Sequence, residues 1–145
     1  MMDFMAKSFG YKTKVYYEDT DAGGIVYYAN YLKYFERART ELIYSLGFDH
    51  KKLNEIDTYI VVRTCNTKYE KPVKFEDEID IETYVSKISP VRINLTQNAL
   101  VKVDLFSTKK VAPLLNTVVI GSGDVLLTFP NNSLIDDEFK KFFSN

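Results

Sequence analysis

The sequence has little of the chemistry that most catalytic and metal sites use. Its 145 residues include one cysteine, one histidine and no tryptophan. Because Cys65 is the only cysteine, an intramolecular disulfide is excluded, and so are zinc sites built from clustered cysteine and histidine. A Ser-His-Asp or Cys-His arrangement would have to use His50. The neighbours of His50 are mostly polar, so we expect it to be a solvated surface residue.

The chain also lacks an excess of charge and a long apolar run. Nineteen Lys and Arg residues against 20 Asp and Glu residues give a formal net charge of −1. A nucleic-acid partner is not expected, because neutralising phosphates needs a basic surface. No stretch is long enough to span a bilayer, and the first ten residues have no apolar run of signal-peptide length. We therefore expect a cytoplasmic protein without a transmembrane segment.

Several signatures of well-known sites are missing as well. No G-x-S-x-G nucleophile elbow, G-x-G-x-x-G dinucleotide fingerprint or phosphate-binding P-loop occurs. No metal or cofactor is implied. What is present is a composition of 46% hydrophobic, 27% charged and 14% aromatic residues, typical of one globular domain over residues 1–145. The aromatic residues, all Tyr and Phe, suit strands or an apolar ligand cleft.

The periodicity of the apolar residues predicts one long helix. Spacings of three and four indicate a helix from about Asn30 to Leu46, whose apolar stripe contains Tyr31, Phe35, Ala38, Leu42 and Leu46. Asn30 is expected to cap the start of this helix, and Gly47 to end it in the left-handed conformation.

Strands are predicted on both sides of that helix. Residues 13–18 favour a first strand. After the helix, β-rich and alternating patterns predict strands over 58–69, 79–85 and 92–105 and within 116–129, with a bulge or turn at 121–123. A short tail helix is expected after Ser133. The order of elements is α+β, and the sheet edges favour dimerisation.

One stretch concentrates the remaining chemistry. Residues 18–31 read Glu-Asp-Thr-Asp-Ala-Gly-Gly-Ile-Val-Tyr-Tyr-Ala-Asn-Tyr. The first N–H groups of the predicted helix lack internal partners, so they can hold the oxyanion that forms when a carbonyl is attacked. A carboxylate beside that carbonyl can attack it or take a proton from water, and Gly23 and Gly24 allow a ligand to approach closely. A thioester suits such a site, because a thiol with a pKa of about 8.5 leaves without help from a strong acid.

Two other interpretations of this stretch remain open at this point. Acidic residues before a helix are favourable for capping and dipole reasons, and two glycines are typical of any tight turn. Asp19-Thr20-Asp21 also has the spacing of the paired acids that share a magnesium ion in phosphotransferases. The preceding run is partly polar, however, and the α/β pattern that such enzymes require is missing.

The block from Val15 to Tyr31, together with Phe35-Glu36-Arg37-Ala38-Arg39-Thr40-Glu41, resembles the signature of a known family. It is similar to the hotdog-fold acyl-CoA thioesterases, in the group of 4-hydroxybenzoyl-CoA thioesterase and the Tol-Pal-associated YbgC thioesterases. The resemblance implies a hotdog fold, in which an antiparallel β-sheet wraps a long central helix. Residues 68–73 and 77–79 resemble further strands of that family.

The resemblance also implies roles for individual residues. Asp21 matches the family's catalytic aspartate, which acts as nucleophile or general base. Tyr28 falls where a backbone N–H polarises the thioester carbonyl, and the residues expected to line the approach of the substrate are Gly23, Gly24, Ile25 and Val26. Glu36 matches an acid that contacts the substrate's phenol in the hydroxybenzoyl enzyme, but we interpret it as part of a charged helix face. Glu18 and Asp19 are expected to be turn and capping residues.

We therefore expect an acyl-CoA thioesterase that releases free acid and CoA without a metal or cofactor. The expected assembly is a homodimer or homotetramer with the active site at the subunit interface, and acyl carrier protein is a second candidate partner. One alternative is a hotdog protein that binds acyl-CoA or acyl carrier protein without hydrolysing it. A hydratase or dehydratase of the same fold is another, but it requires a histidine that His50 is poorly placed to supply.

Overall fold

The computed structural model describes residues 8–55, 59–102 and 117–128. Its elements are β1 (Phe9–Lys14), a 3-10 turn η1 (Tyr17–Asp19), α2 (Asn30–Ser45), α3 (His50–Glu55), β2 (Val61–Tyr69), β3 (Glu78–Ile88), β4 (Arg92–Lys102) and β5 (Thr117–Thr128). The expected end of the fourth strand, at Val103 and Leu105, lies outside the described residues. The expected tail helix after Ser133 also lies outside them.

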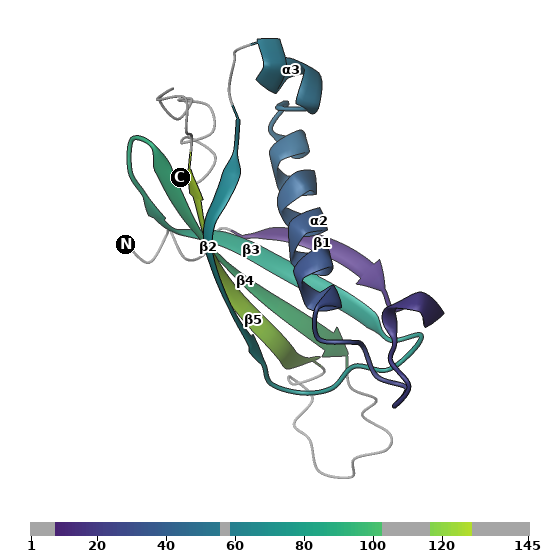
Figure 1. Ribbon diagram of the computed structural model, residues 1–145. Coiled ribbons are helices and arrows are strands. Elements are labelled where there is room, and N and C mark those ends of the chain that lie inside the picture. Colours follow the sequence, from purple (N-terminus) through teal and green to yellow (C-terminus); the bar gives the residue numbers. More distant parts are fainter. Residues whose placement is uncertain (1–7, 56–58, 103–116, 129–145) are drawn as a thin grey trace.

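The strands form one five-stranded sheet in the order β1-β3-β4-β5-β2. Every neighbouring pair is antiparallel. The long helix α2 lies across one face of this sheet, with β1 at one edge and β2 at the other (Figure 1). The predicted α+β architecture, one long helix on an antiparallel sheet, is confirmed.

Helix α2 turns the predicted stripe toward the sheet. Its buried side chains include Tyr31, Tyr34, Phe35, Ala38 and Leu42, as the spacing of three and four requires. The helix ends where it was predicted to end, because Gly47 has a φ of 88°. The N–H of Gly47 donates to the carbonyl of Tyr44 (2.9 Å) and the N–H of Phe48 to that of Ile43 (3.2 Å), which is a Schellman cap. Leu46, the expected last member of the stripe, is half-buried at this cap.

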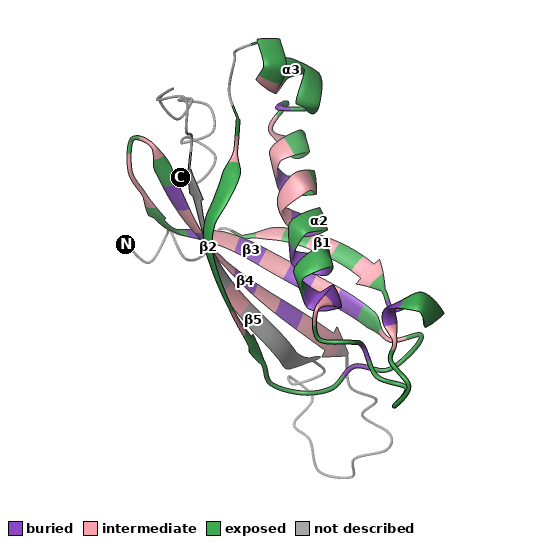
Figure 2. Ribbon diagram, viewed as in Figure 1, coloured by how far each residue is buried: buried purple, intermediate pink, exposed green. Residues whose placement is uncertain are grey.

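The sheet turns alternate residues of its central strands toward α2 (Figure 2). On β3 and β4 the buried residues are Ile79, Ile81, Thr83, Val85, Ile93, Leu95, Gln97 and Ala99. These are the inward-facing positions that the period of two predicted. The buried polar pair is paired: the Gln97 Nε2 donates to the Thr83 Oγ1 (2.9 Å) and to the Phe35 carbonyl (3.0 Å).

Three local predictions were wrong. The first strand was predicted over residues 13–18, but β1 ends at Lys14. The chain then forms the 3-10 turn η1, in which the Tyr16 N–H donates to the Asp19 carboxylate (2.9 Å). Asn30 lies inside α2 and Ala29 is the cap, since the Asn30 amide is used to bind the Asp19 carbonyl (2.8 Å). Residues 121–123 pair with both β2 and β4, so they are not a turn. The irregularity falls just before them, opposite Ala99 and Leu100.

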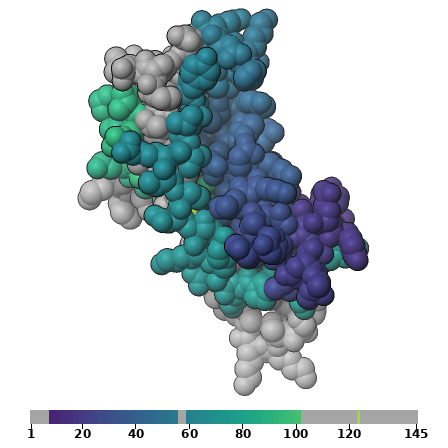
Figure 3. Space-filling model, viewed as in Figure 1, coloured from purple at the N-terminus to yellow at the C-terminus, as the bar shows by residue number. Residues whose placement is uncertain are grey.

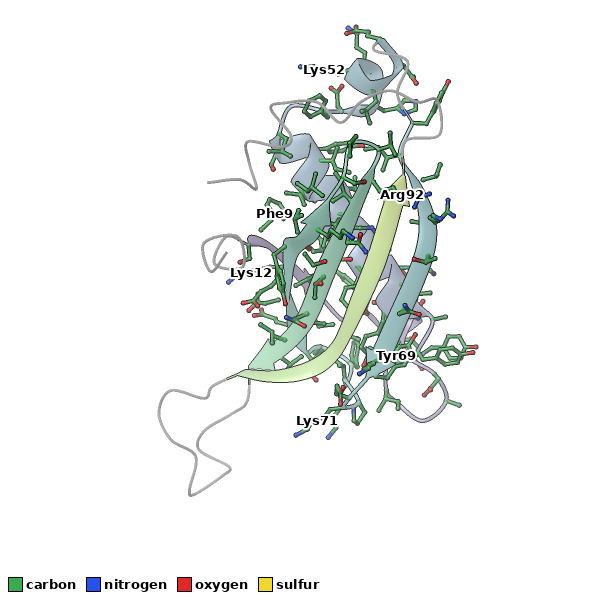
Figure 4. The ribbon with its side chains drawn as sticks, turned by 90° about the vertical axis from the view of Figure 1, so that its left-hand side faces the viewer. Phe9, Lys12, Lys52, Tyr69, Lys71 and Arg92 are labelled. Atoms are coloured by element: carbon green, nitrogen blue, oxygen red, sulfur yellow. The ribbon has the colours of Figure 1, made fainter. Side chains whose placement is uncertain are left out.

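The edge strand β2 is unusual for its length. None of its nine residues is buried, although it pairs with β5 along its whole course. In Figure 4, Tyr69 lies near the lower end of β2, and Arg92 lies at the opposite end of the sheet. The register agrees, because Arg92 and Val61 both pair with Thr128.

The hydroxyl of Tyr34 is the exception to the pairing of buried side-chain polar atoms in the described part of the chain. It is buried and has no hydrogen-bond partner within the described chain. Burial raises the pKa of Tyr34, and the nearby Asp19 carboxylate adds to the effect. The Asp19 carboxylate is near enough to raise the pKa of this hydroxyl but does not meet hydrogen-bond geometry with it, and a buried donor without a well-placed acceptor costs free energy.

We therefore expect Tyr34→Phe to raise the free energy of unfolding at pH 7 by about 1 kcal/mol, and Tm by about 3 °C. Above the unfolded pKa of about 10, the unfolded wild-type chain loses the Tyr34 proton first. Wild-type stability therefore falls as pH rises above 10, and the Phe variant lacks that part of the fall. Urea denaturation at pH 7 and pH 11 measures both effects, with exposed Tyr44→Phe as control. A destabilised Tyr34→Phe would show that the hydroxyl has a partner.

Candidate functional site

The acidic stretch folds into a tight hairpin turn between η1 and α2. Thr20 and Val26 form an antiparallel bridge, and the Asp21 N–H donates to the Ile25 carbonyl (2.8 Å). The Gly24 N–H donates back to the Asp21 carbonyl (3.0 Å). Gly24 has a φ of 81°, a conformation that glycine adopts without steric cost, so this position requires glycine.

The Asp21 carboxylate is exposed and fixed at the top of this turn. Its Oδ1 accepts a hydrogen bond from the Gly23 N–H (2.8 Å). A Cβ at Gly23 would lie 3.2 Å from that oxygen, so a larger residue would crowd the carboxylate. Carboxylates that bond their own backbone two residues on are typical of turns, and the second oxygen of Asp21 stays available.

Asp19 connects the turn to the start of α2 and has a structural role. It is buried, its carboxylate binds the Tyr16 N–H, and its carbonyl accepts from the Tyr27 N–H (2.9 Å) and the Asn30 amide (2.8 Å). The Asn30 side chain therefore fixes where the helix begins relative to Asp21. This confirms that Asp19 serves the turn. Glu18 is exposed.

Two backbone N–H groups remain free at the start of the helix. The N–H groups of Asn30, Tyr31 and Leu32 donate to the carbonyls of residues 27, 28 and 29. Among the described residues, the N–H groups of Tyr28 and Ala29 have no acceptor. The positive end of the helix dipole and the two free donors thus coincide at the position where the sequence predicted a carbonyl clamp.

Aromatic rings form one wall next to these donors. The Tyr28 ring lies 5.9 Å from that of Tyr69 at the end of β2, and Tyr69 lies 5.1 Å from Tyr31 of α2. Burial raises the pKa of Tyr31 and of Tyr69, and hydrogen bonding to Tyr28 raises that of Tyr27. These phenols therefore stay protonated and uncharged at neutral pH.

The arrangement combines the exposed Asp21 carboxylate with the unpaired N–H groups of Tyr28 and Ala29, which follow it by seven and eight residues in the chain. Such a pair can polarise a carbonyl and bring a base or nucleophile to it. Within the described residues, no three His, Cys, Asp or Glu side chains lie close enough together to hold a metal ion. No helix in the same part of the chain is long and apolar enough to cross a bilayer.

Comparison with known proteins gives the family. Residues 23–101, which run from Gly23 in the turn through α2, α3, β2 and β3 to the last but one residue of β4, match the family described as the thioesterase superfamily. Asp21 lies just before the matched residues. The chain belongs to this superfamily.

Two curated relatives of this thioesterase-superfamily chain are named as enzymes. The acyl-CoA thioesterase YbgC of Haemophilus influenzae is 42% identical over 93 residues, which are 63% of this chain and 68% of that protein. The acyl-CoA thioester hydrolase YbgC of Escherichia coli is 37% identical over 89 residues, 61% of this chain and 66% of that protein. The chain thus spans about two thirds of the length of these relatives.

A solved structure shows the fold over almost the whole chain. A mutant of 4-hydroxybenzoyl CoA thioesterase complexed with 4-hydroxybenzoyl CoA superposes with a TM-score of 0.77 at 15% identity, covering 94% of this chain and 99% of that one. The predicted hotdog fold is confirmed.

The site residues predicted for this superfamily member differ in their surroundings. Gly23, Gly24 and Ile25 lie exposed in the turn, and Tyr28 is 60% exposed at the helix start. Val26 is only 4% exposed and its N–H binds the Val73 carbonyl (2.8 Å), so its side chain serves the core below the turn.

Sequence reasoning did not predict that the Tyr69 ring would lie beside that of Tyr28. It lies 41 residues after Tyr28, and β2 carries no alternation that would single it out.

Proposed function

We propose that this chain is an acyl-CoA thioesterase, which hydrolyses an acyl-CoA thioester to free acid and CoA. The observations that carry the proposal are the exposed Asp21 carboxylate in the turn and, seven residues further on at the start of α2, a Tyr28 N–H with no acceptor among the described residues. The names of the two YbgC relatives and membership of the thioesterase superfamily support it.

In the proposed mechanism the thioester carbonyl accepts a hydrogen bond from the Tyr28 N–H. Asp21 then removes a proton from water while the water oxygen forms a bond to the carbonyl carbon. The negative charge moves to the carbonyl oxygen, where the N–H and the helix dipole stabilise it. When the carbonyl re-forms, the C–S bond breaks and CoA leaves as thiolate, which takes up the proton. If Asp21 attacks directly, CoA leaves first and water then hydrolyses the acyl-Asp21 anhydride.

We further propose that the active assembly is a homodimer or homotetramer. The edge strand β2 supports this, because it offers the backbone groups of its outer side to a second chain and exposes Val61, Val62 and Tyr69. The Tyr69 ring contacts that of Tyr28 edge to face, so pairing along β2 would bring a partner subunit to the edge of the site. A cytoplasmic location is proposed from the single cysteine.

The test is a thiol-release assay with the full chain against short, long and aromatic acyl-CoAs, and against an acyl group on acyl carrier protein. Release of CoA with turnover is expected for at least one acyl-CoA. The rival from another class, a binding protein without activity, predicts tight binding with no thiol released from any of them. Preference for the carrier-protein thioester would identify acyl carrier protein as the partner.

The role of Tyr28 can be separated from that of its ring. Because the proposed donor is the backbone N–H, Tyr28→Phe is expected to keep kcat within about threefold of wild type. Steady-state kinetics on the best acyl-CoA measure this, with circular dichroism to verify folding. A loss beyond about a hundredfold, the scale of losing one oxyanion donor or a general acid, would assign the catalytic role to the hydroxyl.

A further inference from the structure

The segment that carries Asp21 is a hairpin of residues 19–27, called here the Asp21 hairpin. Hydrogen bonds join its two arms. The Tyr27 N–H donates to the Asp19 carbonyl (2.9 Å), and the Asp21 N–H donates to the Ile25 carbonyl (2.8 Å). Because these bonds run across the hairpin, the segment is fixed internally, and the position of Asp21 depends on how the whole hairpin is attached to the rest of the chain.

Asn30, the first residue of α2, supplies both hydrogen bonds between the helix and this hairpin. Its backbone N–H donates to the Tyr27 carbonyl (2.9 Å), and its side-chain amide donates to the Asp19 carbonyl (2.8 Å). Within the described residues, no other residue of α2 is hydrogen-bonded to the Asp21 hairpin. In Figure 3 the hairpin and the start of α2, both dark blue, form one continuous part of the surface.

The side-chain bond of Asn30 is buried and does not serve the helix itself. Asn30 and Asp19 are both buried, so water does not readily replace the amide. The cap of α2 is Ala29, which makes no side-chain cap hydrogen bond. The Asp19 carboxylate accepts in turn from the Tyr16 N–H (2.9 Å), which holds Asp19 from its other side. The Asn30 amide is therefore used to attach the hairpin and not to cap the helix.

This bond connects the two parts of the proposed site by a short route. Asp19 precedes Asp21 by two residues, and Asn30 follows Tyr28 by two residues. A base or nucleophile has to lie within reach of the reacting atoms, and a displacement of about 1 Å can lower the rate about a hundredfold. A bond that fixes Asp21 relative to the Tyr28 N–H therefore affects the reaction without touching the substrate.

We infer that Asn30 is a positioning residue, which acts through Asp19 to hold the Asp21 carboxylate in place relative to the Tyr28 N–H. The inference rests on the proposed function, because it assumes that this carboxylate and this N–H act on the same thioester.

Asn30→Leu tests the inference, since leucine has a similar volume and no charge and removes the side-chain hydrogen bond. We expect kcat for the best acyl-CoA to fall at least about tenfold, KM to stay within about threefold, and Tm to fall by about 4 °C. The matched control is Thr83→Val, which removes one buried hydrogen bond under α2, to Gln97 (2.9 Å). It should lower Tm by a similar amount and leave kcat within about twofold. An unchanged kcat in folded Asn30→Leu would show a role in stability alone and overturn the inference.

A double-mutant cycle tests whether Asn30 acts through Asp21. Once the carboxylate is replaced in Asp21→Asn, its position no longer matters. Adding Asn30→Leu should then lower the residual kcat by less than about threefold. If the second substitution instead lowers kcat by its full factor, Asn30 acts independently of Asp21, and the inference is wrong.

The proposed function fails separately, if wild type releases thiol from no acyl-CoA. Hydrogen exchange of the Asp21 and Tyr27 N–H groups then decides about Asn30. Both should exchange at least about tenfold faster in Asn30→Leu and at the wild-type rate in Thr83→Val. Wild-type rates in Asn30→Leu would show that the hairpin holds its place without this bond. If Asn30→Leu does not fold, Asn30→Ala replaces it in all three measurements, with the same expected and contrary results.

Discussion

Asp21→Asn is expected to lower kcat for thioester hydrolysis by about a thousandfold while the protein stays folded. Asparagine has the same shape as aspartate. Its Oδ1 can still accept the hydrogen bond that the Gly23 N–H donates to Asp21 in the wild type (2.8 Å). The turn should therefore persist. The amide neither removes a proton from water nor attacks a carbonyl, so both forms of the mechanism lose their essential group.

The measurement combines steady-state thiol release with thermal unfolding of the same sample. Glu18→Gln is the matched control, because it neutralises an exposed carboxylate in the same segment. It should keep kcat within about twofold and leave Tm unchanged, as surface substitutions usually do. If Asp21→Asn retained more than about a tenth of the wild-type kcat, Asp21 would be a turn residue only, and the catalytic base would have to be sought elsewhere.

Among the substitutions proposed for this protein, Gln97→Leu should lower the free energy of unfolding most. Gln97 is 2% exposed and makes three hydrogen bonds, to Arg39, to the Phe35 carbonyl and to Thr83. Leucine fills a similar volume but leaves the buried Thr83 hydroxyl and the partly buried Arg39 guanidinium without this partner. Burial already lowers the pKa of Arg39, so its charge is costly to leave unpaired. We expect the free energy of unfolding to fall by about 2–3 kcal/mol and Tm by about 5–10 °C.

Urea denaturation measures this loss, and Asn98→Leu provides the comparison. Asn98 is the next residue of β4 and is half-buried on the opposite face of the sheet. The same substituent there should change stability by no more than about 0.5 kcal/mol. Equal effects at the two positions would mean that the polar network under α2 contributes nothing beyond the volume of its side chains.

Most of the helices and strands could be predicted from the local periodicity of apolar residues. The helix could be predicted to within one residue, because its apolar residues recur every three to four positions and Gly47 ends it. The inward faces of β3 and β4 followed from the period of two, including Thr83 and Gln97 among apolar neighbours. What could not be predicted was how those two polar residues are satisfied. Their partners lie on α2 and on each other's strand, 62 and 14 residues apart.

The start of α2 shows the limit of local rules most clearly. Asparagine is a preferred residue type at a helix N-cap. The Asn30 amide nevertheless binds the Asp19 carbonyl 11 residues earlier, and Ala29 takes the cap position. This long-range bond was invisible in the sequence, because capping preferences describe only the neighbouring backbone. It matters for the site, since Asp19 also holds the Tyr27 N–H and so fixes the segment that presents Tyr28.

The sequence by itself determined the chemistry that is on offer: one cysteine, one histidine, and an acidic turn with two glycines before an amphipathic helix. These follow from residue identity and spacing over a few turns of chain. Only the tertiary structure decided that Asp19 is buried while Asp21 is exposed, that the free N–H groups are those of Tyr28 and Ala29, and that β2 lies beside α2. The physical reason is that burial and pairing depend on contacts between segments far apart in the chain, which no local pattern encodes.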